Sequence, residues 1–274
     1  MFTSALQLVR TQLHGNAIVT FCAELDALLH GGVRAGQTVE LCGEPGAGAT
    51  TLSLQLAVDA AIPPLFNGLG GAALVVDTQC AVSAFRLAHL SAALAAHLSA
   101  LYDAQFATAD PRPPPPPTRD EILACIHVVR PRSHVELAAL CHALPHLVRS
   151  LGVRVVVIDS VAALVRGEPL LDDKNGALRT RLLTAISQRL CETAQTCNAA
   201  VVVTNHLTLA PRAADAGATM MQMPALGDRW RHWCETRILL EFDGVNRTAR
   251  VLKGCVADTL CVPFRITTDG VRGD

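Results

Sequence analysis

Lysine is almost absent from this chain of 274 residues: Lys174 and Lys253 are the only two, and every other basic residue is an arginine. The formal net charge is −1, which excludes the strong basic field that attracts a whole protein to nucleic acid. Any contact with nucleic acid must therefore come from local loops. A general drift of composition would exchange lysine for arginine. It would not explain alanine at a position where a motif calls for lysine, as at Ala49 below.

Metal-binding cysteine patterns are lacking as well. The ten cysteines form no CxxC pair and no Cys/His spacing of the zinc type, so we interpret them as reduced thiols of a cytosolic or nuclear protein. His142 and His146 lie four residues apart on an expected helix with no third ligand, which favours ordinary histidines over a metal pair. We find no signal peptide, expect no apolar run to be long enough to span a membrane, and predict no membrane partner.

Apolar residues, in contrast, are plentiful. Half of the chain is hydrophobic, which is enough for one large α/β domain with a substantial core. Short apolar runs predict strands at 38–42, 73–77, 126–130, 153–159 and 200–204. Helical patterns predict helices at 24–29, 50–61, 82–101, 135–147 and 178–196. Residues 237–242, 249–253 and 262–266 predict a closing antiparallel meander, and the alternation predicts a mainly parallel sheet covered by helices on both faces.

A glycine-rich segment joins the first of these strands to a helix. It consists of Gly43, Glu44, Pro45, Gly46, Ala47, Gly48, Ala49 and Thr50. It matches the phosphate-binding pattern GxxxxGK[ST] at every position except the lysine, which is Ala49. The glycines let backbone N–H groups surround phosphate oxygens, and the Thr50 hydroxyl is placed to bind Mg²⁺. The ammonium that normally reaches the β- and γ-phosphates is missing.

Polar residues end three further strands, at Asp77, Asp159 and Asn205. The carboxyl ends of parallel strands meet at one edge of a sheet, where ligands bind, so we expect these residues to lie near the glycine-rich segment. Asp159 follows a buried run and is placed to hold Mg²⁺ together with Thr50. The alternative is a buried aspartate that caps the next helix.

Gln79 marks a second departure from an active site. The Asp77-Thr78-Gln79 segment corresponds to the position that normally supplies a catalytic glutamate. Glutamine can orient a water molecule but cannot accept its proton. Loss of a preorganised charge, here at Ala49, costs on the order of 10²–10³ in rate. The two changes together predict weak or absent hydrolysis.

Two segments lack any regular pattern. Residues 110–118 (DPRPPPPPT) predict an exposed polyproline loop, either a spacer or a site for a partner. Residues 207–226 have no periodicity and predict a mobile loop.

The order of these motifs resembles the RecA/RadA recombinase ATPases over nearly the whole chain. The matching motifs are the phosphate-binding loop, Asp-Thr-Gln at 77–79, Val-Ile-Asp-Ser at 157–160 and Thr-Asn-His at 204–206. Residues 18–32, 56–63, 178–183 and 223–230 further resemble the C-type paralogue of the eukaryotic RecA-like recombinase. The resemblance implies a RecA-like P-loop ATPase core with C-terminal antiparallel strands, and ATP and Mg²⁺ as ligands.

The resemblance also implies roles for individual residues. The nucleotide loop extends through Thr51, and Arg86 corresponds to an arginine near the adenine, although an ordinary surface charge on a helix is the alternative. His206 stands where the family has a glutamine that senses the γ-phosphate, which puts the coupling of ATP to DNA in doubt.

Two loops contact DNA in this family, and they correspond here to about 166–176 and 207–226. They carry Arg166, Lys174 and Arg212, nearly balanced by acidic residues, and have no aromatic residue on which a base could stack. We expect modest, salt-dependent affinity for single-stranded or branched DNA.

Phe2 and Ala5 resemble the Phe-x-x-Ala plug with which one recombinase subunit docks on its neighbour. We expect residues 1–20 to form a linker with this oligomerisation motif, residues 21–274 to form the core domain, and no N-terminal helical DNA-binding domain ahead of the plug.

The function implied is that of a nuclear mediator subunit in homologous recombination and double-strand-break repair. Its partners would be other recombinase paralogues and the recombinase itself. One alternative is an active DNA-dependent ATPase completed in trans by a neighbouring subunit, with Lys253 as a possible finger residue. The other is a degenerate scaffold that binds no nucleotide.

Overall fold

The computed structural model describes residues 17–166, 168, 171, 176–211, 220–254 and 260–273. The predicted residues Phe2, Ala5, Lys174 and Arg212 lie outside this set.

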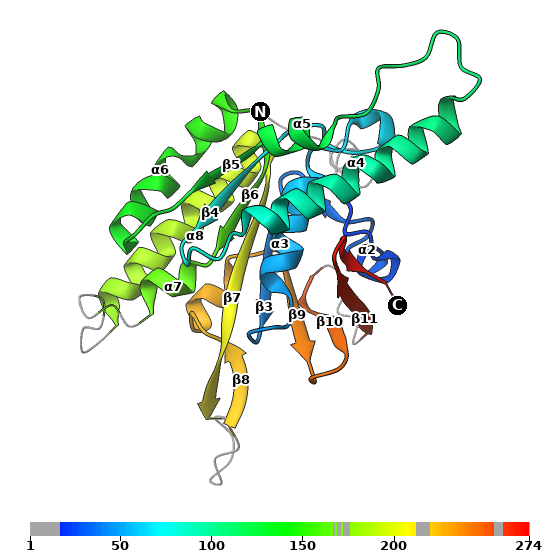
Figure 1. Cartoon of the computed structure of the whole chain (residues 1–274). Helices are drawn as coiled ribbons and strands as arrows, with labels where there is room; N and C mark the ends of the chain where they lie inside the picture. The colour runs from blue at the N-terminus through cyan, green and yellow to red at the C-terminus, as the bar shows by residue number, and fades with distance from the viewer. Residues whose placement is uncertain are drawn as a thin grey trace, which may run out of the picture.

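A ten-stranded sheet runs through the molecule in the order β12-β11-β10-β9-β3-β7-β6-β4-β5, with β8 paired to β7 (Figure 1). The strands of its parallel part are β3 (Thr38–Gly43), β4 (Ala72–Asp77), β5 (Ile126–Val129), β6 (Val153–Asp159), β7 (Ala200–Pro211) and β9 (Thr236–Phe242). The antiparallel strands that complete it are β8 (Met220–Pro224), β10 (Arg247–Lys253), β11 (Cys261–Thr267) and β12 (Gly270–Arg272). A separate two-stranded ladder joins β1 (Ala17–Ile18) to β2 (Val33–Arg34).

Helices cover both faces of the sheet (Figure 1). One face carries α2 (Ala23–Leu28), α3 (Ala49–Asp59), α4 (Ala84–Phe106) and α5 (Arg119–Ala124). The other carries α6 (His134–Ser150), α7 (Val161–Val165) and α8 (Ala177–Cys197). The predicted α/β class, with a mainly parallel sheet and C-terminal antiparallel strands, is confirmed.

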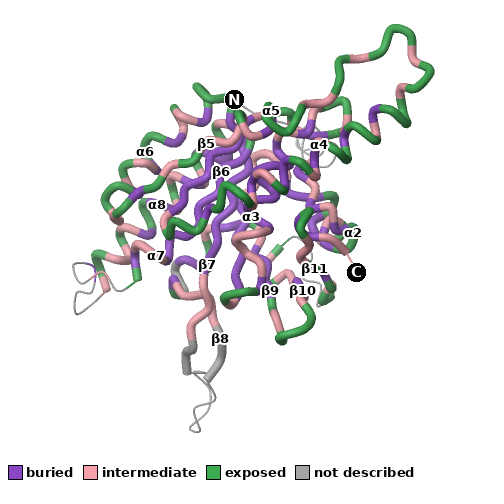
Figure 2. Tube along the Cα trace, viewed as in Figure 1, coloured by how far each residue is buried: buried purple, intermediate pink, exposed green. Residues whose placement is uncertain are grey.

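The core forms two layers because side chains alternate along each strand. In β6, Val155 and Val157 pack with α3 and α4, whereas Val156 and Ile158 pack with α6 and α8. The buried stretches of the central strands lie between the helices in Figure 2. Strands buried on both faces read as continuous apolar runs, which is why these segments could be recognised in the sequence.

The region of residues 207–226 differs from the prediction of a mobile loop. β7 continues to Pro211 and pairs antiparallel with β8, from Leu207 opposite Pro224 to Pro211 opposite Met220. Hydrogen bonds between the two segments stabilise these strands. Such pairing requires no alternation of apolar and polar residues within either segment, so the sequence pattern did not reveal it. Residues 212–219, between the two strands of this ladder, lie outside the described part of the chain.

We also predicted that no apolar run is long enough to span a membrane. This prediction is wrong, because α4 is long and apolar enough by length and composition alone. In this fold α4 lies on α3 and buries one side of its surface, through Leu87, Leu90, Leu94 and Leu98. A helix of this kind is a covering helix of the sheet.

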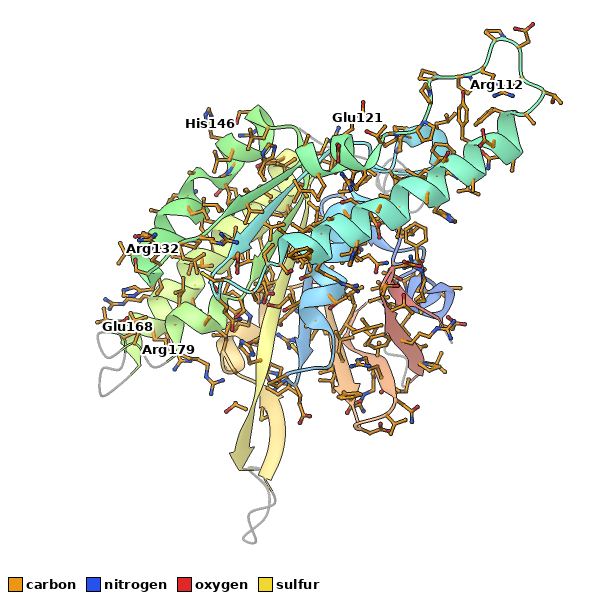
Figure 3. All side chains as sticks on the ribbon, in the orientation of Figure 1. Arg112, Glu121, Arg132, His146, Glu168 and Arg179 are labelled. Atoms are coloured by element: carbon orange, nitrogen blue, oxygen red, sulfur yellow. The ribbon has the colours of Figure 1, made fainter. Side chains whose placement is uncertain are left out.

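Residues 109–117, at the end of α4, have no helical or strand structure. The segment projects from the body of the molecule, with Arg112 on it (Figure 3). Tyr102 of α4 donates a hydrogen bond to the carbonyl of Pro113 at 2.5 Å, and Arg112 Nη2 donates to the carbonyl of Ala107 at the end of α4 at 3.0 Å, so the segment is tied to α4. It ends at a capping box, in which Thr118 and Glu121 bond each other's backbone N–H groups at the start of α5. His142 and His146 of α6 are both exposed, and His146 points away from the sheet in Figure 3.

Candidate functional site

The glycine-rich segment forms a turn between β3 and α3. β3 is buried along its whole length, whereas Pro45 and Gly46 at the tip of the turn are exposed. Gly46 and Gly48 have φ values of +89° and +107°, which glycine adopts without strain. A Cβ atom on Gly48 would also lie 2.7 Å from Ile266 Cδ1. The turn directs the N-terminus of α3, with its free N–H groups, toward the strand edge, as a phosphate cradle requires.

The C-terminal strands support this turn from one side. Phe264 and Ile266 of β11 lie beside Gly48, and Phe242 at the end of β9 lies beside Gly46. Arg247, the first residue of β10, donates a hydrogen bond from Nε to the carbonyl of Gly46 at 3.2 Å. Sequence reasoning missed Arg247, because its position beside the turn depends on the register of the antiparallel strands.

Thr50 and Asp159 lie together at the edge, as expected. The Thr50 hydroxyl donates to Asp159 Oδ2 at 2.7 Å, and the hydroxyl of Thr204, within β7, donates to Oδ1 at 2.5 Å. Asp159 does not cap the following helix, since the N-cap of α7 is Ser160. A hydroxyl and a carboxylate side by side form the oxygen donor set that Mg²⁺ prefers, so these residues fit a magnesium-bound nucleotide.

Asp77 stabilises this edge of the sheet through hydrogen bonds and an ion pair. Its carboxylate accepts hydrogen bonds from the Ala81 N–H at 3.0 Å and from Arg130 Nε at 3.0 Å. The neighbouring Thr78 hydroxyl accepts from the Ser160 N–H at 2.8 Å. These bonds fix the ends of β4 and β6 relative to each other and position Gln79 at the strand edge.

Gln79, Ser160 and His206 meet in a triangle of polar atoms. Gln79 Nε2 lies 3.2 Å from Ser160 Oγ and 3.3 Å from His206 Nε2, and Ser160 Oγ lies 3.2 Å from the same ring nitrogen. Because the amide nitrogen can only donate, these contacts suit a His206 ring whose Nε2 accepts and whose proton is on Nδ1. The residue at the position of the missing base is therefore in contact with the residue at the sensor position.

Arg86 lies in the first turn of α4, on the side of the C-terminal strands. Its Nη1 donates to the carbonyl of Thr268, between β11 and β12, at 2.7 Å. Burial lowers the pKa of the Arg86 guanidinium, and the charge of nearby Arg272 lowers it further. Arg86 thus joins α4 to the turn between β11 and β12. Its partner Thr268 is two residues from Ile266, the side chain that lies beside Gly48.

A buried network lies beneath the edge and connects the strands that carry it. Glu40 of β3 is fully buried and accepts hydrogen bonds from Asn205 Nδ2 at 2.7 Å, Trp230 Nε1 at 2.9 Å and Arg237 Nε at 2.6 Å. Burial alone would lower the pKa of Arg237, but the Glu40 carboxylate raises it overall. The network joins β3, β7 and β9 to the short 3₁₀ helix η3 (Asp228–His232).

Lys253 is held within its own subunit. Its ammonium donates to the backbone carbonyls of His232, at 3.1 Å, and of Cys234. A lysine bound to carbonyls in this way is a poor finger residue for a neighbouring subunit.

The predicted DNA loops are described only in part. Arg166 follows α7 directly, and Glu168 in the first loop lies 3.7 Å from His134 Nδ1. The cationic side chains predicted further along the two loops lie outside the described residues.

Comparison with known proteins gives matches along nearly the whole chain. A family model described as an AAA domain matches residues 5–210. The DNA repair protein RAD51 homolog 3 of Cricetulus griseus is 33% identical over 270 residues, covering 98% of this chain and 72% of the relative. The protein of the same name from Dictyostelium discoideum is 32% identical over 273 residues, with 98% and 69% covered. The human DNA repair protein RAD51 homolog 2 is 26% identical over 277 residues, with 92% and 67% covered.

Proposed function

The chain belongs to the family of RecA-like recombinases, among the paralogues of RAD51, and from this we propose that it is a C-type paralogue acting in homologous recombination and DNA repair. It works in the nucleus as a subunit of a mediator complex with other paralogues and the recombinase. It binds Mg²⁺-ATP and hydrolyses it slowly or not at all. The proposal of the C type is supported by the identities to the two proteins named RAD51 homolog 3, which exceed that to the protein named RAD51 homolog 2.

One observation carries the nucleotide part of this proposal: the cradle is retained while two catalytic groups are absent. The glycines around Gly48, the N-terminus of α3 and the Thr50–Asp159 pair supply what holds a magnesium-bound triphosphate. Ala49 supplies no charge to the phosphates, and Gln79 supplies no base. A bound Mg²⁺ would neutralise phosphate charge at Thr50 and Asp159.

The arrangement of Gln79 and His206 supports a sensing role rather than turnover. Both side chains reach the edge where a γ-phosphate would lie, and they contact each other and Ser160. Such a group can respond to the γ-phosphate by exchanging its hydrogen bonds for bonds to the phosphate. It does not promote hydrolysis, because Gln79 cannot accept a proton from the attacking water. Nucleotide binding then sets the conformation in which the subunit meets its neighbours.

The subunit contact is proposed to involve residues 1–20, with Phe2 and Ala5 as the plug, ahead of a core domain at 21–274. Loop residues Arg166, Lys174 and Arg212 contribute modest affinity for single-stranded or branched DNA. Residues 110–118 form an insert between α4 and α5 within that core.

The function is tested in cells that lack this protein, with a reporter that scores repair of a double-strand break by homologous recombination. The wild-type gene is expected to restore repair, and Phe2→Glu is expected to abolish both repair and co-purification of paralogues while leaving the melting temperature unchanged. Wild-type levels of repair in the deficient cells would overturn the proposed function. Undiminished co-purification of the Phe2→Glu variant would instead show only that the plug assignment is wrong.

A further inference from the structure

The phosphate-binding turn lacks a cation of its own at Ala49, yet a cation from another part of the chain touches it. Arg247 lies 201 residues from Gly46 in the sequence and donates from Nε to the Gly46 carbonyl at 3.2 Å. This bond uses one of the five N–H donors of the guanidinium. The four donors on the two terminal nitrogens remain beside an exposed turn whose backbone is built for anions.

Arg247 is held in this place by the strands around it. In the register of the sheet it lies opposite Phe242 on β9 and opposite Phe264 on β11. Its guanidinium carbon lies 4.1 Å from the centre of the Phe242 ring, in a cation–π contact. Phe242 and Phe264 also lie beside Gly46 and Gly48, so the strands that fix the arginine also support the turn.

No carboxylate among the described residues is paired with Arg247. The ion pairs formed by arginines of this region are Arg237 with Glu40 and Arg250 with Glu241. The acidic residue closest in sequence, Asp243, accepts hydrogen bonds from the N–H groups of Val245 and Asn246, which lower its pKa. The charge of Arg247 is thus available to a ligand.

We propose that Arg247 supplies in cis the positive charge that the phosphate-binding turn lacks at Ala49, and that binding of a magnesium-bound nucleoside triphosphate depends on it. This inference rests on the proposed nucleotide binding and concerns the same site. A guanidinium bonded to the turn makes charge-assisted hydrogen bonds to phosphate oxygens, which are stronger than bonds between neutral groups. Such a bond contributes on the order of a tenfold or greater change in affinity.

The test is a titration of the whole chain with a fluorescent ATP analogue in the presence of Mg²⁺, at several salt concentrations. Arg247→Gln keeps a donor for the Gly46 carbonyl and removes the charge, whereas Arg247→Lys keeps the charge. Arg250→Gln is the matched control, since Arg250 lies on the same strand, on the opposite face, and pairs with Glu241 at a distance of 3.6 Å.

We expect Arg247→Gln to weaken binding about tenfold or more and to reduce its salt dependence. Arg247→Lys should stay within about threefold of the wild type, as expected when charge is what matters, and Arg250→Gln should bind like the wild type. Equal losses in the Gln and Lys variants with an unchanged salt dependence would show a structural role and overturn the inference. Unchanged binding by Arg247→Gln would overturn it as well.

A second variant separates this inference from the proposed function. Ala49→Lys restores the cation within the turn, so Arg247→Gln should cost much less in that background than in the wild type. Equal costs in both backgrounds would contradict the inference, because residues that share a role are not additive. A wild-type chain that binds no nucleotide at all would refute the proposed nucleotide binding itself, and with it this inference.

Discussion

Replacing Glu40 by leucine is expected to lower the free energy of unfolding by about 3–5 kcal/mol. The Glu40 carboxylate lies 2.6 Å from Arg237, and the two side chains are 0% and 5% exposed. Removal of the carboxylate leaves a buried guanidinium without its partner, and leaves Asn205 and Trp230 without their acceptor. Because a domain is stabilised by only about 5–15 kcal/mol in total, this one change removes a large part of the stability.

The magnitude is measured by urea denaturation of Glu40→Leu, Arg237→Met and the double variant. Each single change should cost about 3–5 kcal/mol, and the double variant should cost clearly less than their sum, because no lone charge stays buried. Glu241→Leu is the matched control. Its pair with Arg250 is about half exposed at 3.6 Å, and an exposed pair contributes at most about 1 kcal/mol.

A loss below about 1 kcal/mol for Glu40→Leu would contradict a stabilising role of the buried pair, since it would place the pair among weak surface interactions. Strict additivity of the two single changes would contradict that role as well, since it would show that the two residues act independently. Either result would mean that β3, β7 and β9 keep their places without this network.

Three further outcomes are expected. Ala49→Lys should tighten binding of Mg²⁺-ATP about tenfold while turnover stays low. Only Ala49→Lys combined with Gln79→Glu should raise the rate of phosphate release. Full hydrolysis by Ala49→Lys alone would show that Gln79 does not limit the reaction. Exposed Cys80 should react with iodoacetamide in the native protein, whereas burial raises the pKa of Cys141 to about 12, so mass spectrometry should find Cys141 unmodified until the chain unfolds. Burial also raises the pKa of Asp59 well above its ordinary value, so the folded chain holds a proton that the unfolded chain releases, and the free energy of unfolding falls as the pH rises above the unfolded pKa. Asp59→Asn should therefore raise the melting temperature more at pH 8 than at pH 5. An equal change at both pH values would contradict this.

The part of the site that follows one local pattern was predictable from the sequence. A strand, a glycine-rich turn and a helix are adjacent in the chain, so Gly43 to Thr50 could be placed directly. Thr50 and Asp159 are 109 residues apart, but both follow buried parallel strands, and the ends of such strands meet at one edge. The same rule placed Asp77 and Asn205 there, and the positions of Gln79 and His206 followed from the family resemblance.

The rest depends on register and on the reach of long side chains. Arg247 meets Gly46 only because β10 pairs with β9 in the observed register, and nothing near position 247 in the sequence marks it. The Glu40 network joins four elements, and an isolated glutamate in an apolar strand does not reveal its partners. β8 was missed because a hairpin ladder is stabilised by pairing rather than by periodicity. The start of α5 could have been found, since Thr118 and Glu121 have the spacing of a capping box.

Nucleotide binding and phosphate release are to be measured together on the same purified sample, for the wild type and for Thr50→Ala and Asp159→Asn. We expect saturable, Mg²⁺-dependent binding of ATP by the wild type, weakened in both variants, with turnover far below the order of 1 s⁻¹ that is common for enzymes. Turnover of that order in the wild type, lost in both variants, would contradict the proposal that this site binds nucleotide without efficient hydrolysis. The absence of any binding would contradict it too.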